Sequence, residues 1–333
     1  MKKKIVIVGG CGFIGHNLAI ELCKTNEVCI VDSLSVNNLY SRDRNDSTNK
    51  KLSTSILNSR IELLNENKIE LIIQDARDYH AISRIMNEIS PDIIIHLAAV
   101  SHANKSNKDP HSTFDHSLRT LENVLDSAKN FKSHLIYISS SMVYGNFAQD
   151  SVNEDSVCNP IGIYGNLKYA GELMVKSYNQ VFDLPYTIIR PSALYGERCV
   201  SRRVGQIFIE NAIQGLDISI DGDGNEKLDF TYIKDLIQGI TLCCKNSKAI
   251  NEIFNFTYGH SRKISELADM IKKEFPRIEI SYKERDKLMP KRGTLSIQKA
   301  KNLLGYNSSY PIEKGYSDYI QWYKNYYKDY FIK

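Results

Sequence analysis

The stretch KIVIVGGCGFIGHNLAIELC, residues 4–23, decides the fold class. A run of apolar residues ends in a glycine-rich turn, and a pattern with helical spacing follows. Gly9, Gly12 and Gly15 are spaced G-x-x-G-x-x-G across the turn. Between a strand and a helix, such a turn lets the backbone approach a pyrophosphate at the helix N-terminus, where free N–H groups favour an anion. The stretch therefore predicts a dinucleotide-binding strand–turn–helix unit.

The second apolar run, EVCIVD, ends in Asp32. A carboxylate there accepts hydrogen bonds from the adenosine ribose hydroxyls and repels a 2′-phosphate, so NAD is favoured over NADP. The alternative is a structural glycine turn with a helix-capping aspartate. Asp75 follows the third run, where its carboxylate can meet the adenine amine. Further positions expected to line the cofactor are Phe13, Ile14, Ala76, Leu97, Ala98 and Ala99.

Short apolar runs alternate with helical patterns over the first part of the chain. The strand candidates are residues 4–10, 27–32, 70–76, 92–99, 134–141 and 186–192, and the helical patterns are 14–25, 81–89, 120–131 and 164–182. This alternation predicts an α/β fold, a Rossmann-type doubly wound parallel sheet with helices on both faces. Residues 35–67 are polar, and we expect a surface excursion with one helix outside the core.

Beyond Gly196 the pattern loosens. Residues 204–215 and 264–275 have helical spacing, and residues 217–244 show a strand–turn–strand–helix pattern. The tyrosine-rich residues 316–331 predict an amphipathic helix whose rings pack in a core, because no basic groove accompanies them. We expect an NAD-binding domain at 1–190 and a smaller C-terminal α/β substrate domain at 191–333, with a soft boundary and interleaved segments.

The composition excludes several classes of protein. The 333 residues carry a net charge of only +4, with acidic and basic residues interspersed, so we expect no nucleic-acid partner. The basic start MKKK resembles a signal peptide, but the apolar run breaks at Gly9–Gly10, and no run approaches a membrane span. Seven cysteines without a CxxC pair predict free thiols in a reducing cytoplasm. The histidine spacings predict no metal site.

The stretch YGNLK places Tyr164 and Lys168 four residues apart, on one face of the predicted helix. An ammonium beside a phenol stabilises the phenolate. Such a tyrosine can take a proton from a hydroxyl while hydride leaves the adjacent carbon. Because this spacing is common by chance, its interpretation depends on the other motifs.

The motifs GGCGFIG, Asp32, HLAA, SSSMVYG and YGNLK resemble, in order and spacing, the extended short-chain dehydrogenase/reductases. The resemblance is to their NAD-dependent nucleotide-sugar epimerase/dehydratase branch, which includes the UDP-glucose 4-epimerase-like proteins. RPSALYGE, GDGNEKLDFTYIKD and KAKNLLGY resemble C-terminal signatures of that branch. The resemblance implies tightly held NAD, a domain that binds a nucleoside-diphosphate sugar, and a homodimer formed through a four-helix bundle that includes the helix of Tyr164.

In this family the catalytic Ser or Thr stands four residues before the tyrosine of VYG, which implies Ser140. Its hydroxyl would bind the sugar oxygen that Tyr164 deprotonates, and Lys168 would tune Tyr164 and hold the nicotinamide ribose. Tyr164 and Lys168 would thus both contact the cofactor. In sugar 4,6-dehydratases the next two positions carry an acid and a glutamate, or at least the glutamate that removes the C5 proton. Here they are Ser141 and Met142, and a thioether cannot abstract a proton.

The missing carboxylate favours chemistry that needs only hydride and one proton at a single carbon. The first hypothesis is an NAD-dependent nucleotide-sugar epimerase that oxidises C4 transiently to a 4-keto sugar. The alternative is a C4 dehydrogenase or 4-keto reductase with the same catalytic residues. A third hypothesis, a non-catalytic NAD-binding regulator, is opposed by intact Ser140, Tyr164 and Lys168.

Several positions depart from the family pattern. His116 stands where an asparagine is usual, and is interpreted either as a cofactor-contact change near the nicotinamide or as a surface or packing histidine. Ala193 and Leu228 replace an asparagine and an arginine that contact the substrate diphosphate in the family. The nucleotide and the sugar therefore stay open.

Nearby basic residues can replace the lost contacts, because arginine binds phosphate in a bidentate manner. We expect Arg202 and Arg292 to bind substrate, and Arg203 and Lys227 to be solvated surface charges. The full predicted substrate set is Ser101, Ser140, Ser141, Met142, Tyr164, Arg202 and Arg292.

Overall fold

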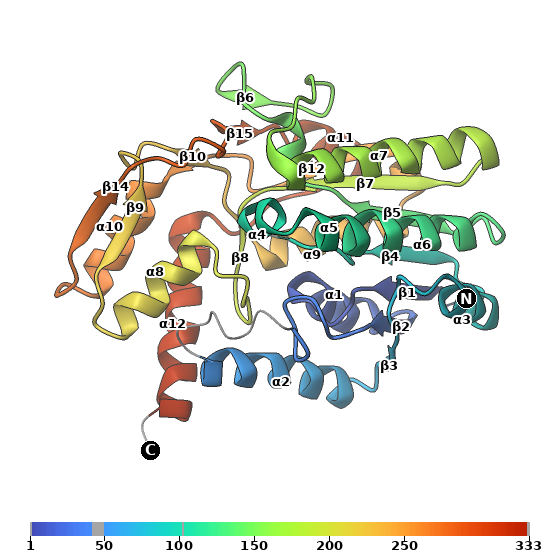
Figure 1. The fold of residues 1–333 in the computed structure, drawn as a ribbon, viewed down its shortest axis with the longest axis horizontal. Helices are drawn as coiled ribbons and strands as arrows, with labels where there is room; N and C mark the ends of the chain where they lie inside the picture. The colour runs from blue at the N-terminus through green and yellow to red at the C-terminus, as the bar shows by residue number, and fades with distance from the viewer. Residues whose placement is uncertain (1, 42–49, 102, 332–333) are drawn as a thin grey trace.

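The structure, a computed structural model, describes residues 2–41, 50–101 and 103–331 (Figure 1). Seven strands form one parallel sheet in the order β12-β7-β5-β4-β1-β2-β3. They are β1 Lys4–Val8, β2 Glu27–Asp32, β3 Glu70–Ile73, β4 Ile93–His96, β5 His134–Ile138, β7 Tyr186–Pro191 and β12 Glu252–Phe256. The predicted doubly wound α/β class is confirmed.

The central strands are rich in Val and Ile because helices cover both faces of a parallel sheet. In β1, Ile5 and Ile7 face one core while Val6 and Val8 face the other. The first core is closed by α1 Phe13–Leu22, α9 Ile233–Lys245 and α11 Gln298–Leu304, and the second by α3 Tyr79–Ile89, α6 Thr120–Ala128 and α7 Gly162–Phe182. Each of the six predicted strands is present, and β12 is a seventh that the sequence analysis did not predict.

Helix α2, Lys50–Glu66, corrects the expectation that residues 35–67 lie outside the core. Its buried residues Leu52, Ile56, Arg60 and Leu64 are spaced four apart, so they form one stripe of the helix. Leu64 joins the first core of the sheet, while Leu52 and Ile56 join a third hydrophobic core. The polar residues between them hide this stripe in the sequence.

The third core lies in a smaller body of short strand pairs and helices, on the left in Figure 1. The strand pairs are β8 Leu194–Tyr195 with β11 Thr231–Tyr232, β9 Ile218–Asp221 with β14 Ile280–Lys283, and β10 Lys227–Leu228 with β13 Arg262–Lys263. Its helices are α8 Val204–Ile213, α10 Ile264–Glu274 and α12 Ile312–Phe331. Tyr316, Tyr319 and Tyr323 of α12 are fully buried, so the predicted packing role of the tyrosine-rich helix is confirmed.

The remaining elements are short. They are α4 Ala103–Lys108, α5 Pro110–Phe114, the π-helix η2 Asp115–Arg119, the 3₁₀ helices η3 Ser141–Tyr144 and η4 Ser247–Ala249, and the pair β6 Ser151–Val152 with β15 Thr294–Leu295. Within the described ranges, no helix combines the length and apolar character that crossing a bilayer requires.

Candidate active site

Two adjoining pockets lie at the carboxyl ends of the parallel strands. The smaller has a volume of about 140 Å³ and the larger about 450 Å³. They share the lining residues Ile14, Leu97, Ala99, Ser101, Leu194 and Arg203. The strand order reverses between β1 and β4, which is where open α/β sheets bind their ligands.

The smaller pocket is built around the glycine turn. Gly9 has φ +81°, and a Cβ there would lie 2.6 Å from the backbone nitrogen of Ala98, so only glycine fits. A Cβ on Gly15 would lie 2.4 Å from the carbonyl oxygen of Gly10, which lets α1 pack tightly on the turn. Gly12 is the N-cap of α1 and has no side chain to satisfy the first N–H groups. The turn therefore fits a pyrophosphate.

Asp32 ends β2 and lines the same pocket. Its Oδ2 accepts a hydrogen bond from the Cys11 N–H at 2.8 Å, and its Oδ1 accepts one from the Leu34 N–H at 2.7 Å. Burial raises the pKa of Asp32, and these hydrogen bonds and the charge of Arg60 oppose the rise. The carboxylate is thus fixed where an adenosine ribose would lie.

All predicted cofactor positions other than Tyr164 and Lys168 line the smaller pocket: Gly9, Gly12, Phe13, Ile14, Gly15, Asp32, Asp75, Ala76, Leu97, Ala98 and Ala99. Asp75 accepts a hydrogen bond from Nη2 of Arg77 at 2.7 Å. His116 of η2 also lines this pocket and does not line the larger one. The structure therefore places His116 on the Asp75 side, apart from Tyr164 and the predicted reacting centre.

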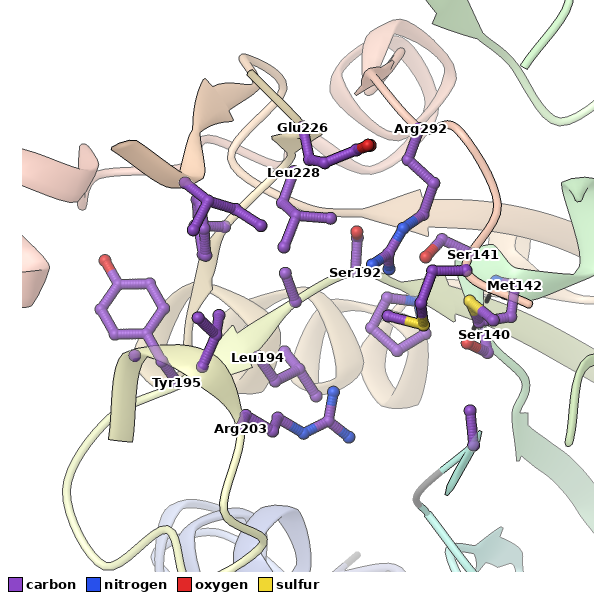
Figure 2. Close-up of a pocket in the computed structure, with 18 of the residues that line it drawn as sticks. Ser140, Ser141, Met142, Ser192, Leu194, Tyr195, Arg203, Glu226, Leu228 and Arg292 are labelled. Atoms are coloured by element: carbon purple, nitrogen blue, oxygen red, sulfur yellow. Dashed lines mark hydrogen bonds between the residues drawn. The ribbon is translucent and has the colours of Figure 1, made fainter. Parts of the chain in front are cut away.

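Ser140, Tyr164 and Lys168 all line the larger pocket, with Ser141 and Met142 beside Ser140 (Figure 2). Ser140 follows the end of β5, and its Oγ accepts a hydrogen bond from the Met142 N–H at 3.2 Å. Lys168 donates from Nζ to the carbonyl oxygen of Ile138 at 2.7 Å. Burial lowers the pKa of Lys168 to about 8, against the opposing charge of Glu172. A phenol, a hydroxyl and an ammonium in one cavity can bind and deprotonate a ligand hydroxyl.

Met142 is buried, and its thioether forms part of the wall beside Ser140. The carboxylates among the described lining residues come instead from the smaller body: Asp221, Glu226 and Asp286. Glu226 forms an ion pair with Arg285. The positions next to Ser140 thus offer no group that could take a proton from carbon.

Four arginines of the described chain line the larger pocket, among them Arg203 at the N-cap of α8 and Arg292 on the opposite wall (Figure 2). Nε of each of these two is buried without a hydrogen-bond partner. Arg203 donates from Nη2 to the carbonyl oxygen of Ser101 at 3.2 Å. Burial lowers the pKa of Arg292 to about 10, and the charge of Arg203 adds to this effect. Guanidinium groups whose buried Nε donors have no partner favour an anionic ligand.

The expectation that Arg203 is a solvated surface charge is wrong, because it lines both pockets. Arg202, which precedes it, has φ +49° and forms an ion pair with Glu210 at 3.6 Å, while also lining the larger pocket. Lys227 also lines the larger pocket, but it keeps 43% of its side chain exposed and pairs with Asp150. Both adjacent arginines thus line the larger pocket, but Arg202 is paired with a carboxylate of the fold whereas Nε of Arg203 is not.

Leu228 and Ala193, at the two departures from the family pattern, line the larger pocket too. Glu172 lies one helical turn beyond Lys168 and is not among the predicted residues. The signal for it is the repeated spacing of four from Tyr164 through Lys168. Its partner, Arg190, comes from the separate strand β7, and no local pattern connects the two.

Comparisons with known proteins agree with this geometry. The model of the NAD dependent epimerase/dehydratase family matches residues 5–256. A putative UDP-glucose 4-epimerase of Methanocaldococcus jannaschii is 30% identical over 328 residues, covering 96% of this chain and 98% of that protein. A dTDP-D-glucose 4,6-dehydratase of Dictyostelium discoideum is 28% identical, covering 81% of this chain and 61% of that protein.

Among solved structures, the UDP-glucuronic acid 4-epimerase of Bacillus cereus, in complex with UDP-glucuronic acid and NAD, has a TM-score of 0.87. It is 26% identical and covers 97% of this chain and 99% of that one. The similarity thus includes both bodies of the fold.

Proposed function

Because the chain belongs to the NAD-dependent epimerase/dehydratase family, we propose that it is a nucleotide-sugar epimerase that inverts C4 through a transient 4-keto sugar. One observation carries the proposal. Ser140, Tyr164 and Lys168 line a single cavity that adjoins the glycine-turn pocket, with Met142 at the position of a dehydratase acid. The names of relatives such as the Bacillus cereus 4-epimerase support the same reaction.

The smaller pocket would hold the dinucleotide, with the glycine turn at the pyrophosphate and Asp32 at the adenosine ribose. The chemistry that NAD would supply there is the uptake of a hydride from C4 and its return to the opposite face of the sugar. Tyr164 takes the proton of the C4 hydroxyl, and Ser140 donates a hydrogen bond to the same oxygen. The Lys168 ammonium stabilises the phenolate. After the keto sugar has turned, Tyr164 returns the proton, so hydride and proton balance and no net oxidation remains.

Arg203 and Arg292 would hold the diphosphate of the substrate. Each has an unpartnered buried Nε, and both line the larger pocket. A diphosphate supplies acceptors in the geometry that guanidinium groups bind best. In this proposal the pair of arginines takes over from the two family contacts that Ala193 and Leu228 lack.

The proposal also includes a homodimer and a location in the cytoplasm. A homodimer through α7 is supported by the exposed apolar residues Leu173, Val181 and Phe182 on that helix. A reducing cytoplasm is supported by seven cysteines that are all free thiols. The oligomeric state in solution, measured by light scattering, tests the first of these two statements.

The test is an incubation of the purified protein with NAD and UDP-, GDP-, dTDP- and CDP-sugars, followed by near-UV absorbance and NMR of the sugar. A new C4 stereoisomer without accumulation of NADH is the expected result. Stoichiometric NADH with a 4-keto sugar would establish a dehydrogenase instead. Loss of water from C6 would contradict the interpretation of Met142, and NAD binding without turnover of any sugar would indicate a regulator.

A further inference from the structure

Behind the candidate catalytic residues lies a buried ion pair that the proposed mechanism does not use. Glu172 and Arg190 are 0% and 2% exposed. Arg190 donates from Nε to Oε1 of Glu172 at 2.9 Å and from Nη2 to Oε2 at 2.6 Å. Ser139 donates from Oγ to Oε1 at 2.5 Å. The Glu172 carboxylate is therefore held by groups at the ends of β5 and β7.

This carboxylate shares one face of α7 with the two residues proposed to act on the substrate. Tyr164, Lys168 and Glu172 follow one another at intervals of four. Lys168 is hydrogen-bonded to the carbonyl oxygen of Ile138, and Glu172 to the hydroxyl of Ser139. Ile138, the last residue of β5, and Ser139, which follows it, are thereby attached to α7, and Ser140 comes next in the chain.

The ion pair also supports the turn that follows Ser140. The guanidinium carbon of Arg190 lies 4.8 Å from the ring centroid of Tyr144, the last residue of η3. The Tyr144 hydroxyl donates to Oδ1 of Asn255 on β12 at 2.8 Å. Because η3 carries Ser141 and Met142, the buried pair of Glu172 and Arg190 supports the chain on both sides of Ser140.

We propose that Glu172 is a positioning residue of the reaction: it fixes α7 on the end of β5 and supplies the negative charge that faces Lys168. The roles of Tyr164, Lys168 and Ser140 in this statement rest on the proposed function. The placement of Glu172 rests on the contacts alone.

The other groups that face Lys168 from neighbouring strands are neutral. His96 of β4 is fully buried, and burial, followed by the charge of Lys168, lowers its pKa to about 3. The ring centroid of Tyr137 on β5 lies 5.1 Å from Nζ of Lys168. Burial, followed by the charge of Glu172, raises the pKa of Tyr137, so this phenol is uncharged at neutral pH.

From α7 itself, Tyr164 and Glu172 face Lys168, and Arg190 of β7 is paired with Glu172. Among the described residues, Glu172 is the group that raises the pKa of Lys168 against the larger effect of burial. Lys168 acts as an ammonium, so turnover is lost as the pH rises through its pKa. Removing the charge of Glu172 lowers that pKa, and the alkaline limb of the pH profile must then move to lower pH.

The first test is the pH dependence of kcat/KM for Glu172→Gln. We expect the alkaline limb to move down by about one pH unit and kcat to fall roughly tenfold. Glu122→Gln, which removes an exposed carboxylate paired with Arg119, is the matched control and should leave the profile unchanged. A uniform loss of kcat at every pH, with the limb unmoved, would overturn the electrostatic part of the proposal.

Ser139→Ala keeps the ion pair intact and so remains informative if Glu172→Gln fails to fold. The loss of one positioning hydrogen bond should lower kcat roughly three- to tenfold. KM for the sugar nucleotide and the alkaline limb should not change. The control is Ser177→Ala, which removes an exposed serine hydroxyl elsewhere on α7. Wild-type kcat in Ser139→Ala would overturn the positioning role.

A measurement without turnover separates this proposal from the proposed function. In protein with ¹⁵N-labelled lysine, the Lys168 ammonium signal is identified by its loss in Lys168→Met and then titrated by NMR. We expect the midpoint to lie at lower pH in Glu172→Gln than in the wild type. An unchanged midpoint overturns the inference about Glu172, whereas a shifted midpoint in a protein that processes no sugar nucleotide overturns only the proposed function.

Discussion

On the side of the larger pocket formed by β5 and α7, the buried charges have partners within the fold, whereas on the side formed by Arg203 and Arg292 the Nε donors have none. We call these the catalytic side and the substrate side. A buried donor without a partner costs about 1–3 kcal/mol, which a ligand that supplies an acceptor recovers. The catalytic side is completed by folding, and the substrate side by binding, so substitutions on the two sides should change different quantities.

The largest effect expected on the catalytic side comes from removing a single reacting atom. In Tyr164→Phe the fold keeps its contacts but loses the phenol that exchanges the proton, so turnover should fall about a thousandfold. NMR of the sugar measures turnover, and a binding titration should show NAD affinity unchanged. Tyr169→Phe, on the same helix but outside the pocket lining, is the control. Turnover near that of the wild type in Tyr164→Phe would contradict the assignment of Tyr164 as the group that exchanges the proton.

The buried ion pair of Glu172 and Arg190 should contribute to the free energy of unfolding. Arg190→Met leaves the Glu172 carboxylate buried and unpaired, so the free energy of unfolding should fall by roughly 3–5 kcal/mol. Arg119→Met removes an exposed pair with Glu122, whose side chains are 48% and 47% exposed, and should cost less than about 1 kcal/mol. Urea unfolding of both variants measures the difference. Equal losses would show that folding does not depend on the buried pair as proposed.

On the substrate side the same type of substitution should change binding instead. Arg203→Met and Arg292→Met each remove a donor that the fold leaves unpaired, so neither should lower the free energy of unfolding appreciably. KM for the sugar nucleotide should rise roughly 10- to 100-fold, because a charge-assisted hydrogen bond contributes about 1.5–3 kcal/mol. Exposed Arg277 provides the control Arg277→Met. A loss of stability as large as that of Arg190→Met would erase the distinction between the two sides.

The smallest effect is expected at Met142, whose thioether cannot act as the base of a dehydration. Met142→Leu conserves volume, so kcat should stay within about threefold and stability within about 1.5 kcal/mol of wild type. Steady-state kinetics and thermal unfolding measure both quantities. Leu is the appropriate replacement because it removes the sulfur and keeps the wall. A large fall in kcat would mean that the thioether has a chemical role on the catalytic side.

Most of the sheet could be predicted because strands buried on both faces consist of continuous Val and Ile runs. Strand β12 could not, because its sequence EIFNF interrupts the apolar run with Asn255. This asparagine is buried through hydrogen bonds with Tyr144 and with the carbonyl oxygen of Ser296, partners distant in sequence. The stripe of α2 was likewise hidden between polar residues.

The same distinction applies to the site. The glycine turn could be predicted because Gly9 has φ +81°, a backbone conformation that the turn itself requires and that favours glycine. The different partners of Arg202 and Arg203 depend on the backbone angle of Arg202 and on Glu210, which the sequence does not place. Glu172 becomes identifiable only when β7 brings Arg190 to it. Local geometry was thus predictable, and contacts between distant segments were not.

Strand β12 also bears on how the protein is made. It covers the edge of β7 with residues 252–256, which leave the ribosome long after the first six strands. Until they emerge, β7 presents an open edge of apolar residues, the kind of template on which nascent chains pair wrongly with one another. Asn255, the hydrogen-bond partner of Tyr144, arrives in the same segment. We therefore expect chains that terminate early to aggregate, and an unfinished chain to lack a working site.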